Sequence, residues 1–157
     1  MAIAAMYLKL TGVTGESLAD KHVGDIDLVS WKWGMQSSHY LSTGAPSGAA
    51  QFSLITVTKR FDRSTPTLFQ YLDTHKLVSN GTLTVAKSSG GSPLEYVTID
   101  MTNVRIVTVD VRSDDAELIE LVTLSAETIT VNYTPQASAG SLASGPISFT
   151  AAHPATQ

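Results

Sequence analysis

The chain lacks cysteine and carries few charged residues. With no cysteine among its 157 residues, structural disulfides and thiolate metal ligands are excluded. Charged residues make up 15% of the sequence, whereas roughly a quarter is usual in globular proteins. The net charge is −4 and the basic residues are scattered, so the basic stripe of a nucleic-acid-binding protein is missing. A protein with so few charged residues has a surface that is either polar without charge or covered by partner molecules.

Long apolar runs are also missing. The first ten residues have no basic start and no continuous apolar core, so they do not form a convincing signal peptide. No apolar run approaches the ~18 residues of a membrane-spanning helix. The mass of 16.7 kDa fits one domain with a sizeable core. We expect a cytoplasmic protein with no membrane span, which would need a dedicated machine for export.

The sequence contains no recognisable catalytic or metal-binding motif. Its four histidines are far apart, whereas a zinc site needs clustered ligands; they are His22, His39, His75 and His153. No Gly-x-Ser-x-Gly elbow occurs. We therefore predict no catalytic residue, no metal site and no cofactor, and we interpret the histidines as loop and helix-end residues.

Two further segments have simpler explanations than a binding site. The densest acidic cluster lacks the spacing of a calcium loop, and we interpret it as a solvated turn; it comprises Asp114, Asp115, Glu117 and Glu120. The glycine-rich run 88–91 is followed by neither a lysine nor a helix, as a phosphate-binding loop would require. We interpret this run as a hairpin turn.

Hydrophobic periodicity predicts a mainly β protein. Apolar and polar residues alternate in many short segments, which is typical of half-buried strands; these segments are 6–10, 26–33, 55–61, 83–85, 97–101, 107–111 and 129–133. Asn80-Gly81 is a strong turn signal between two of them. The pattern indicates an antiparallel two-sheet β-barrel or sandwich with one α-helix on its side.

The helix is predicted to begin at Ser64 or Thr65. Either residue can act as the N-cap, with Pro66 at the first helical position. The apolar residues that follow recur at helical spacing, and we expect the helix to end near Lys76.

The segment Ile26 to Gly34, IDLVSWKWG, is the most informative part of the chain. A strand would place Trp31 and Trp33 on one face together with Val29. This grouping favours the core over an exposed sugar-stacking surface, and Ser30 and Lys32 point away from it. The apolar parity shifts after Leu28, which indicates a β-bulge or a strand buried on both faces.

The long segment 36–50 is rich in Ser, Gly, Ala and Thr. Connections in compact domains are mostly ~4–6 residues, and longer loops are usually functional or disordered. Tyr40 and Leu41 lie in the middle of this segment, where a purely solvated loop has little use for apolar side chains. We expect it to dock on another subunit.

Five short motifs, in order and at compatible spacing, resemble the haemolysin-coregulated proteins, or Hcp, the tube subunits of bacterial type VI secretion systems. The motifs are Gly15-Glu16-Ser17, IDLVSWKWG, the block Thr58-Lys59 with Asp62, Ser64-Thr65-Pro66 and Leu68, the run Pro93-Leu94-Glu95-Tyr96, and Val131-x-Tyr133-x-Pro135.

The resemblance implies a β-barrel with a side helix at 1–135. The extension 136–157 could add a short terminal strand at Ile147 and Phe149. Hcp-like proteins form homohexameric rings that stack into a tube inside a contractile sheath. The sheath drives the tube and its tip, or spike, into a target cell without a signal peptide, and effector proteins are carried in the ring lumen.

For this chain the resemblance implies two functional surfaces and no enzyme activity. Ser30 and Lys32 are expected to face the lumen and the cargo, because an uncommitted polar face suits varied effectors. Tyr40, Leu41, Ser42 and Thr43 are expected to form the ring-stacking loop. A phage tail-tube subunit shares these mechanics and is the nearest alternative. A monomeric β-sandwich ligand-binding module is an alternative from another class, and it would need exposed aromatic residues and a stable monomer.

Overall fold

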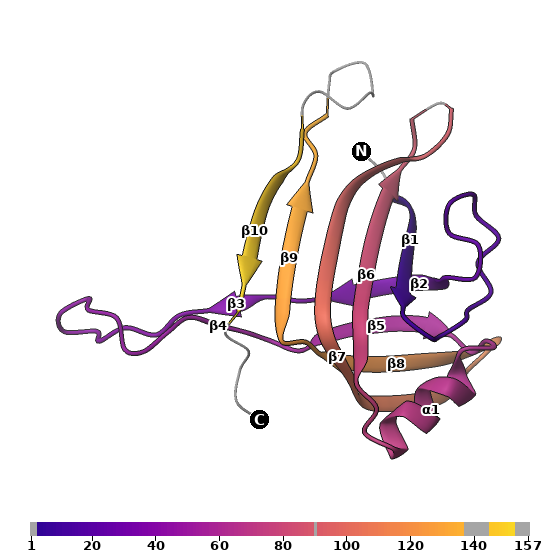
Figure 1. Ribbon diagram of the computed structural model, residues 1–157, viewed down its shortest axis with the longest axis horizontal. Coiled ribbons are helices and arrows are strands. Elements are labelled where there is room, and N and C mark those ends of the chain that lie inside the picture. The colour runs from indigo at the N-terminus through magenta and orange to yellow at the C-terminus, as the bar shows by residue number, and fades with distance from the viewer. Residues whose placement is uncertain (1–2, 90, 137–144, 153–157) are drawn as a thin grey trace.

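The computed structural model describes residues 3–89, 91–136 and 145–152. These residues form ten strands and one helix, α1 (Thr65–Asp73) (Figure 1). The strands are β1 (Ile3–Leu10), β2 (Ile26–Lys32), β3 (Met35–Gln36), β4 (Gln51–Phe52), β5 (Ile55–Arg60), β6 (Val78–Lys87), β7 (Leu94–Asp114), β8 (Glu117–Ser125), β9 (Thr128–Tyr133) and β10 (Ile147–Ala151).

Eight strands follow one another in the order β10-β9-β7-β6-β1-β2-β5-β8, and β8 also pairs with β7, which closes a barrel. Closure depends on β7, which is 21 residues long. The first part of β7 pairs with β6 and β9, and its second part pairs with β8, all antiparallel. The predicted antiparallel β-barrel with one helix is confirmed.

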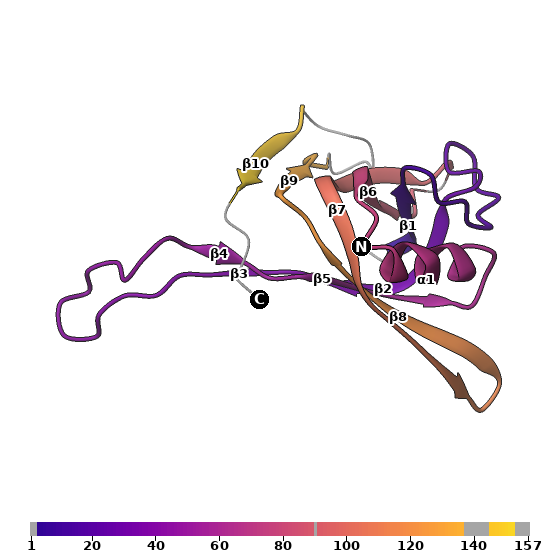
Figure 2. The same ribbon diagram turned by 60° about the horizontal axis from the view of Figure 1, so that its bottom comes forward.

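The two parts of β7 belong to two layers that run crosswise (Figures 1 and 2). We call β10, β9, the first part of β7, β6 and β1 the five-stranded layer. The four-stranded layer consists of β2, β5, β8 and the second part of β7. Helix α1 lies at the end of the barrel opposite β10 (Figure 1).

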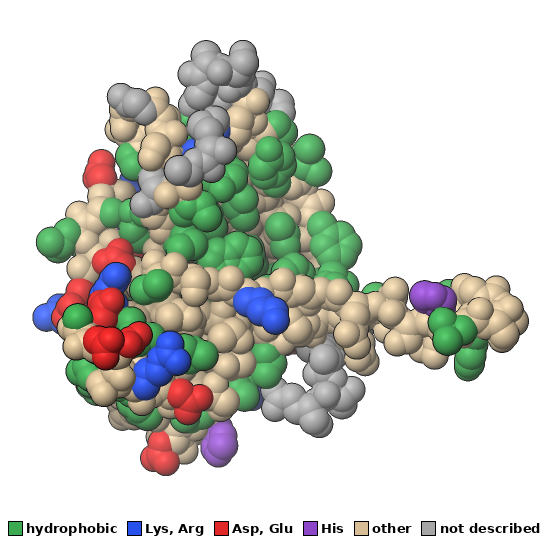
Figure 3. All heavy atoms as spheres, turned by 180° about the vertical axis from the view of Figure 1, so that it is seen from behind, with side chains coloured by type: hydrophobic (Ala, Val, Ile, Leu, Met, Phe, Trp, Pro, Cys, Tyr) green, Lys and Arg blue, Asp and Glu red, His purple; other side chains and the backbone are tan. Residues whose placement is uncertain are grey.

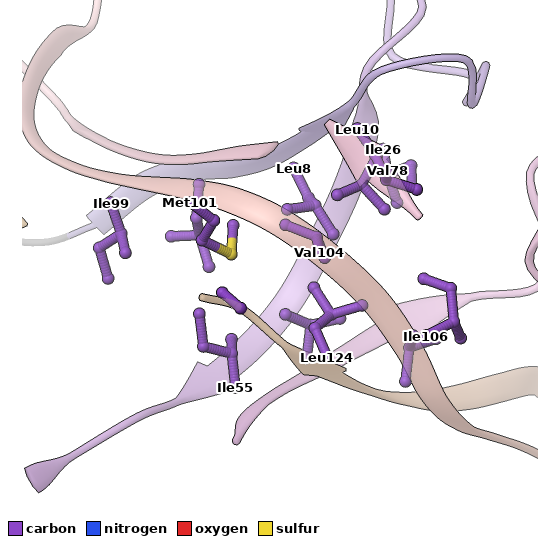
Figure 4. Packing of buried hydrophobic residues seen from close by; sticks show 14 of the residues in the cluster. Leu8, Leu10, Ile26, Ile55, Val78, Ile99, Met101, Val104, Ile106 and Leu124 are labelled. Carbon is purple, nitrogen blue, oxygen red and sulfur yellow. The ribbon is translucent and has the colours of Figure 1, made fainter. Parts of the chain in front are cut away.

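The core lies between the layers and is filled by the inward side chains of both. Alternate residues of β5 are buried, from Ile55 to Val57, while the residues between them are partly exposed. Figure 4 shows core side chains of both layers meeting, with Ile99 and Met101 of β7 on one side and Leu124 of β8 on the other. Burial of aliphatic side chains in this arrangement is the main stabilising contribution to the fold.

Strand β2 contains a bulge, the first of the two explanations offered for its parity shift, and the bulge moves one residue out of the expected core face. The pairing with β5 shifts between Leu28 and Ser30, so Val29 is left 39% exposed. The expectation that Val29 shares the core with the tryptophans is wrong, because the bulge turns its side chain outward. Trp31 and Trp33 are half-buried and pack at the edge of the core.

The helix begins where the sequence predicts. Its first residue is Thr65, Pro66 follows within the first turn, and the helix ends at Asp73, three residues earlier than expected. Ser64 occupies the N-cap but makes no side-chain cap hydrogen bond, because its hydroxyl donates to Asp62 instead.

The predicted turn at Asn80-Gly81 is wrong, because both residues lie inside β6. Gly81 lies where a Cβ atom would be 2.9 Å from a methyl carbon of Leu10, so a larger residue would force that side chain to shift. The expected strands 97–101 and 107–111 are one continuous strand, β7. The expected terminal strand at Ile147 and Phe149 is present as β10 and pairs with β9.

The segment 35–52, which we call the arm, projects away from the barrel (Figures 1 and 2). Strands β3 and β4 pair at its base, and an isolated bridge joins His39 to Pro46 further out. No Asp, Glu, Lys or Arg occurs between Trp33 and Thr58. The arm is therefore a long surface without formal charge apart from its one histidine.

Candidate functional surfaces

The outward side of the four-stranded layer is a polar face that includes both residues expected to face the lumen. Ser30 pairs with Thr58, and Lys32 pairs with Thr56. Directly paired residues of an antiparallel sheet share a face, and Ser30 and Lys32 are exposed. Seen from behind, this band of the molecule is mostly uncharged polar surface (Figure 3).

The polar face continues across the layer as a ladder of threonines. Thr56 pairs with Thr123 of β8, which in turn pairs with Thr108 of β7. The hydroxyl of Thr108 donates to that of Thr123 over 2.7 Å. The row from Lys32 to Thr108 therefore presents one cation and three hydroxyl-bearing side chains.

The tip of the arm places two apolar residues away from the core. Leu41 is 98% exposed and Tyr40 is 60% exposed. Two backbone hydrogen bonds fix the turn: Tyr40 N–H donates to Ala45 O, and Gly44 N–H donates to Tyr40 O. Ser42 and Thr43 complete this turn, so the four expected stacking residues lie together at the exposed tip of the arm.

A buried ionic network joins β5 to the start of α1 and to β8. The ammonium of Lys59 lies 3.1 Å from the Glu120 carboxylate and 2.9 Å from that of Asp62. The hydroxyl of Thr65 donates to Glu120 over 2.6 Å, and Ser64 donates to Asp62. This network accounts for the Lys, Asp, Ser and Thr of the third motif, because each holds the strand-to-helix junction in place.

The interpretation of the acidic cluster as a solvated turn is wrong for Glu120. Its side chain is fully buried, because Lys59 supplies the opposite charge across the β5–β8 pairing. Asp114 and Asp115 lie at the exposed hairpin turn as expected, and exposed Glu117 pairs with Arg60 over 2.7 Å.

His22 joins the loop after β1 to the start of β7. Its Nδ1 atom lies 2.8 Å from an Asp25 carboxylate oxygen, and its Nε2 atom lies 2.6 Å from a Glu95 carboxylate oxygen. Its ring stacks on Tyr7 with centroids 4.1 Å apart. Both ring nitrogens can donate only in the imidazolium form. Burial raises the pKa of the Tyr7 phenol above its ordinary 10.0, and the carboxylates of Asp27 and Glu95 add to this rise.

The predicted position of the histidines is confirmed for three of them, although the contacts of His22 were not foreseen. His22 lies in the loop, His39 in the arm, and His75 follows the end of α1; His153 lies outside the described residues. Single-sequence reasoning had no signal for the pairing of His22 with Glu95, because 73 residues separate them in the chain.

The first motif also has a structural role. Gly15 N–H donates to Gly24 O over 2.7 Å, and Ser17 N–H donates to Asp25 O over 3.0 Å. A Cβ atom on Gly15 would lie 2.4 Å from the Asp25 carbonyl oxygen, so only glycine fits. The two interactions fold the loop tightly against itself.

Two further features bear on function. No three His, Cys, Asp or Glu side chains come together as a metal site would require within the described ranges. No helix in the part of the chain that the structure describes is both long and apolar enough to cross a membrane.

Comparison with known proteins identifies the family. The sequence model of the family described as "Type VI secretion system effector, Hcp" matches residues 7–134. The chain belongs to the Hcp family. It is 32% identical to Protein hcp1 of Pseudomonas aeruginosa over 148 residues, which covers 92% of this chain and 91% of the relative.

Solved structures of Hcp-family proteins share the fold. A type VI secretion system effector from Yersinia pestis matches with a TM-score of 0.76 and 27% identity, covering 94% of this chain and 98% of the other. Hcp1 from Salmonella typhimurium matches with a TM-score of 0.76 and 26% identity, covering 96% and 94% of the two chains. Hcp-family proteins are tube subunits of type VI secretion systems and are secreted by them, and this chain is such a subunit.

Proposed function

We propose that six copies of the chain close into a ring, and that rings stack into the inner tube that the secretion sheath and spike expel with effector proteins in its lumen. The observation that supports the ring is that the strands at both ends of the four-stranded layer are paired on one side. At one end of this layer, residues 30–32 of β2 pair with β5 and with no other strand of the described chain. At the other end, the described pairings of residues 105–114 of β7 are with β8 alone.

Each of these two strand segments has one unpaired edge, and the two edges lie at opposite ends of one layer. This arrangement suits head-to-tail assembly. An exposed strand edge carries unpaired N–H and C=O groups and is a template for pairing with another chain. A contact between two different surfaces of identical copies closes into a ring when the rotation permits. Joining the four-stranded layers of neighbouring copies would leave neither of these two edges open and would form a continuous cylinder.

In this ring the polar face lines the lumen, with Ser30 and Lys32 towards the cargo. Its supporting feature is the threonine ladder beside Lys32, because hydroxyl groups can donate and accept hydrogen bonds with many partners. The same face offers little apolar area for tight binding, which suits cargo that must be released.

The arm stacks one ring on the next. Tyr40, Leu41, Ser42 and Thr43 lie at its tip, and an uncharged arm can be covered without the cost of desolvating ions. Assembly takes place in the cytoplasm, and the tube leaves through the secretion machine.

Negative-stain imaging of the purified protein tests the ring. We expect open-centred particles, with short stacks at high concentration. A field of small compact particles at every concentration would contradict the proposal and would favour a monomeric binding module.

A further inference from the structure

His22 links the middle of the loop after β1, residues 11–25, to the five-stranded layer. Backbone hydrogen bonds in the middle of this loop stay within it, as where Gly15 N–H donates to Gly24 O. The side chain of His22 instead reaches out of the loop to the carboxylate of Glu95, at the start of β7. The position of the loop on the barrel therefore depends on the state of one imidazole ring.

The two polar contacts of this ring require it to be protonated. Its Nδ1 atom lies 2.8 Å from an Asp25 oxygen and its Nε2 atom lies 2.6 Å from a Glu95 oxygen. An ionised carboxylate only accepts hydrogen bonds, and a neutral imidazole has a proton on one nitrogen and a lone pair on the other. In the neutral ring, one contact would set a lone pair against a carboxylate oxygen. The imidazolium form donates to both, and we call this pair of contacts the His22 bridge.

The backbone around His22 fixes the place of the ring. His22 N–H donates to Ala19 O over 2.9 Å, and Asp25 N–H donates to His22 O over 3.0 Å. The preceding residue, Lys21, has a φ of 69°, in the left-handed region that non-glycine residues enter at a cost. Such a conformation persists only where the surrounding structure holds it. The tight turn thus keeps the ring between its two carboxylates.

Acidic groups outnumber basic groups around the ring. Among the described residues, the titratable groups facing it are Tyr7 on β1, Asp27 on β2, Glu95 on β7, and Asp20, Lys21 and Asp25 in its own loop. Uncharged residues complete the cavity beside it, namely Ala86 of β6 with Ser92 and Pro93 of the turn before β7. A positive ring is therefore compensated by the charges of its surroundings.

Loss of the ring proton should break the contact with Glu95 and keep the contact with Asp25. The side chain of Glu95 is 37% exposed, whereas that of Asp25 is 11% exposed, so Glu95 can turn into water more easily. Asp25 also lies in the same loop as His22 and is held there by its backbone hydrogen bond. The loop then loses its link to β7, and the cavity of about 360 Å³ that these residues line can widen.

We propose that the His22 bridge is a pH-dependent switch, in which the protonated ring holds the loop against β7 and the neutral ring releases it. The bridge is complete where the imidazole is protonated and both carboxylates are ionised, and it is lost as the pH rises and the ring gives up its proton. Histidine is the side chain that ordinarily changes charge between about pH 5 and 8. Tyr7 keeps its phenolic proton in that range, because its pKa is raised above 10.0.

Hydrogen exchange of the loop, measured by mass spectrometry at several pH values, tests the switch. Relative to the intrinsic exchange rate at each pH, the protection of residues 13–25 should fall about tenfold or more as the ring loses its proton, as expected for one hydrogen bond between charged groups. Exchange of the imidazole C2 proton reports the protonation of His22 in the same samples, and the two changes should share one midpoint. Loop protection that stays constant through the titration of His22 would overturn the inference.

Glu95→Gln tests the identity of the partner. An amide can accept a hydrogen bond from the protonated ring and donate one to the neutral ring, so this variant should keep the loop protected and lose the pH response. Glu95 is partly exposed, so the change leaves the fold intact. His39→Gln, a histidine change in the arm, is the matched control and should respond as the unmodified protein does. A pH response that survives in Glu95→Gln would overturn the bridge, whether or not copies of the chain assemble into rings.

Discussion

The Lys59 ammonium lies 3.1 Å from the Glu120 carboxylate, and both side chains are 0% exposed. Their pairing joins β5 to β8, and Asp62 and Thr65 extend it to the start of α1. The strand-to-helix junction is thus held by charges that water cannot screen.

Removing one partner of this pair should be strongly destabilising. We expect Lys59→Met to lower the free energy of unfolding by about 3–5 kcal/mol, because two carboxylates remain buried without a cation. Adding Glu120→Leu should recover part of the loss. Urea denaturation measures the change, and Arg60→Ala is the control. Arg60 pairs with Glu117 at the surface, where the side chains are 62% and 46% exposed, so its loss should cost less than about 1 kcal/mol. Equal effects of the two single changes would contradict this account.

The tight loop at Gly15 gives a second prediction. In Gly15→Ala the new methyl group would lie 2.4 Å from the Asp25 carbonyl oxygen, and we expect a loss of about 1–3 kcal/mol from this overpacking. Gly34→Ala is the matched control, because no atom lies within 4 Å of its Cβ position. Thermal unfolding compares the two variants, and a Gly15→Ala protein as stable as Gly34→Ala would show that the loop can relax.

Tyr7 should make stability fall at high pH. Its pKa is raised above 10.0 by burial and by nearby carboxylates, so the folded protein holds the phenolic proton more tightly than the unfolded chain does. The stabilising effect is complete below pH 10 and is lost as pH rises through the folded-state pKa. Stability measured from pH 8.5 upward should therefore decline less steeply in Tyr7→Phe than in the unmodified protein. Parallel curves would argue against this role of Tyr7.

Shortening the arm should separate stacking from ring closure. We expect deletion of residues 40–43 to abolish stacks while single rings keep their mass, because the tip lies outside the barrel. Negative-stain imaging distinguishes stacks from single rings. Persistent stacks would rule out the tip as the stacking element, and loss of the rings themselves would place the arm in the ring contact instead.

Reversing the charge at Lys32 should change cargo retention. Lys32→Glu places an anion on the polar face next to the threonine ladder, and we expect retention of an effector co-expressed from the same secretion locus to change at least severalfold. Pull-down of the tagged effector measures retention. Lys9→Glu is the control, because Lys9 is exposed on the other layer. Unchanged retention in Lys32→Glu would exclude the lysine as a cargo contact.

Local chemistry made several elements predictable from sequence. Proline at the first turn and the apolar spacing after it located the start of α1, and the parity shift after Leu28 located the bulge in β2. Each signal acts within a few residues, so no tertiary information was needed.

The errors arose where tertiary packing overrides a local signal. Gly81 follows an asparagine and looks like a turn, yet it lies inside β6, where the side chains of Leu10 and Met101 come close to its Cβ position. Glu120 looks like part of a solvated cluster, yet Lys59 lies directly opposite it on the neighbouring strand β5.

The mass of the assembled protein in solution tests the central claim most directly. Native mass spectrometry of the unmodified chain should give a species of six times the 16.7 kDa subunit mass, because the proposed contacts close head to tail around a ring. A single species at the subunit mass, across concentrations at which tube proteins assemble, would contradict the account.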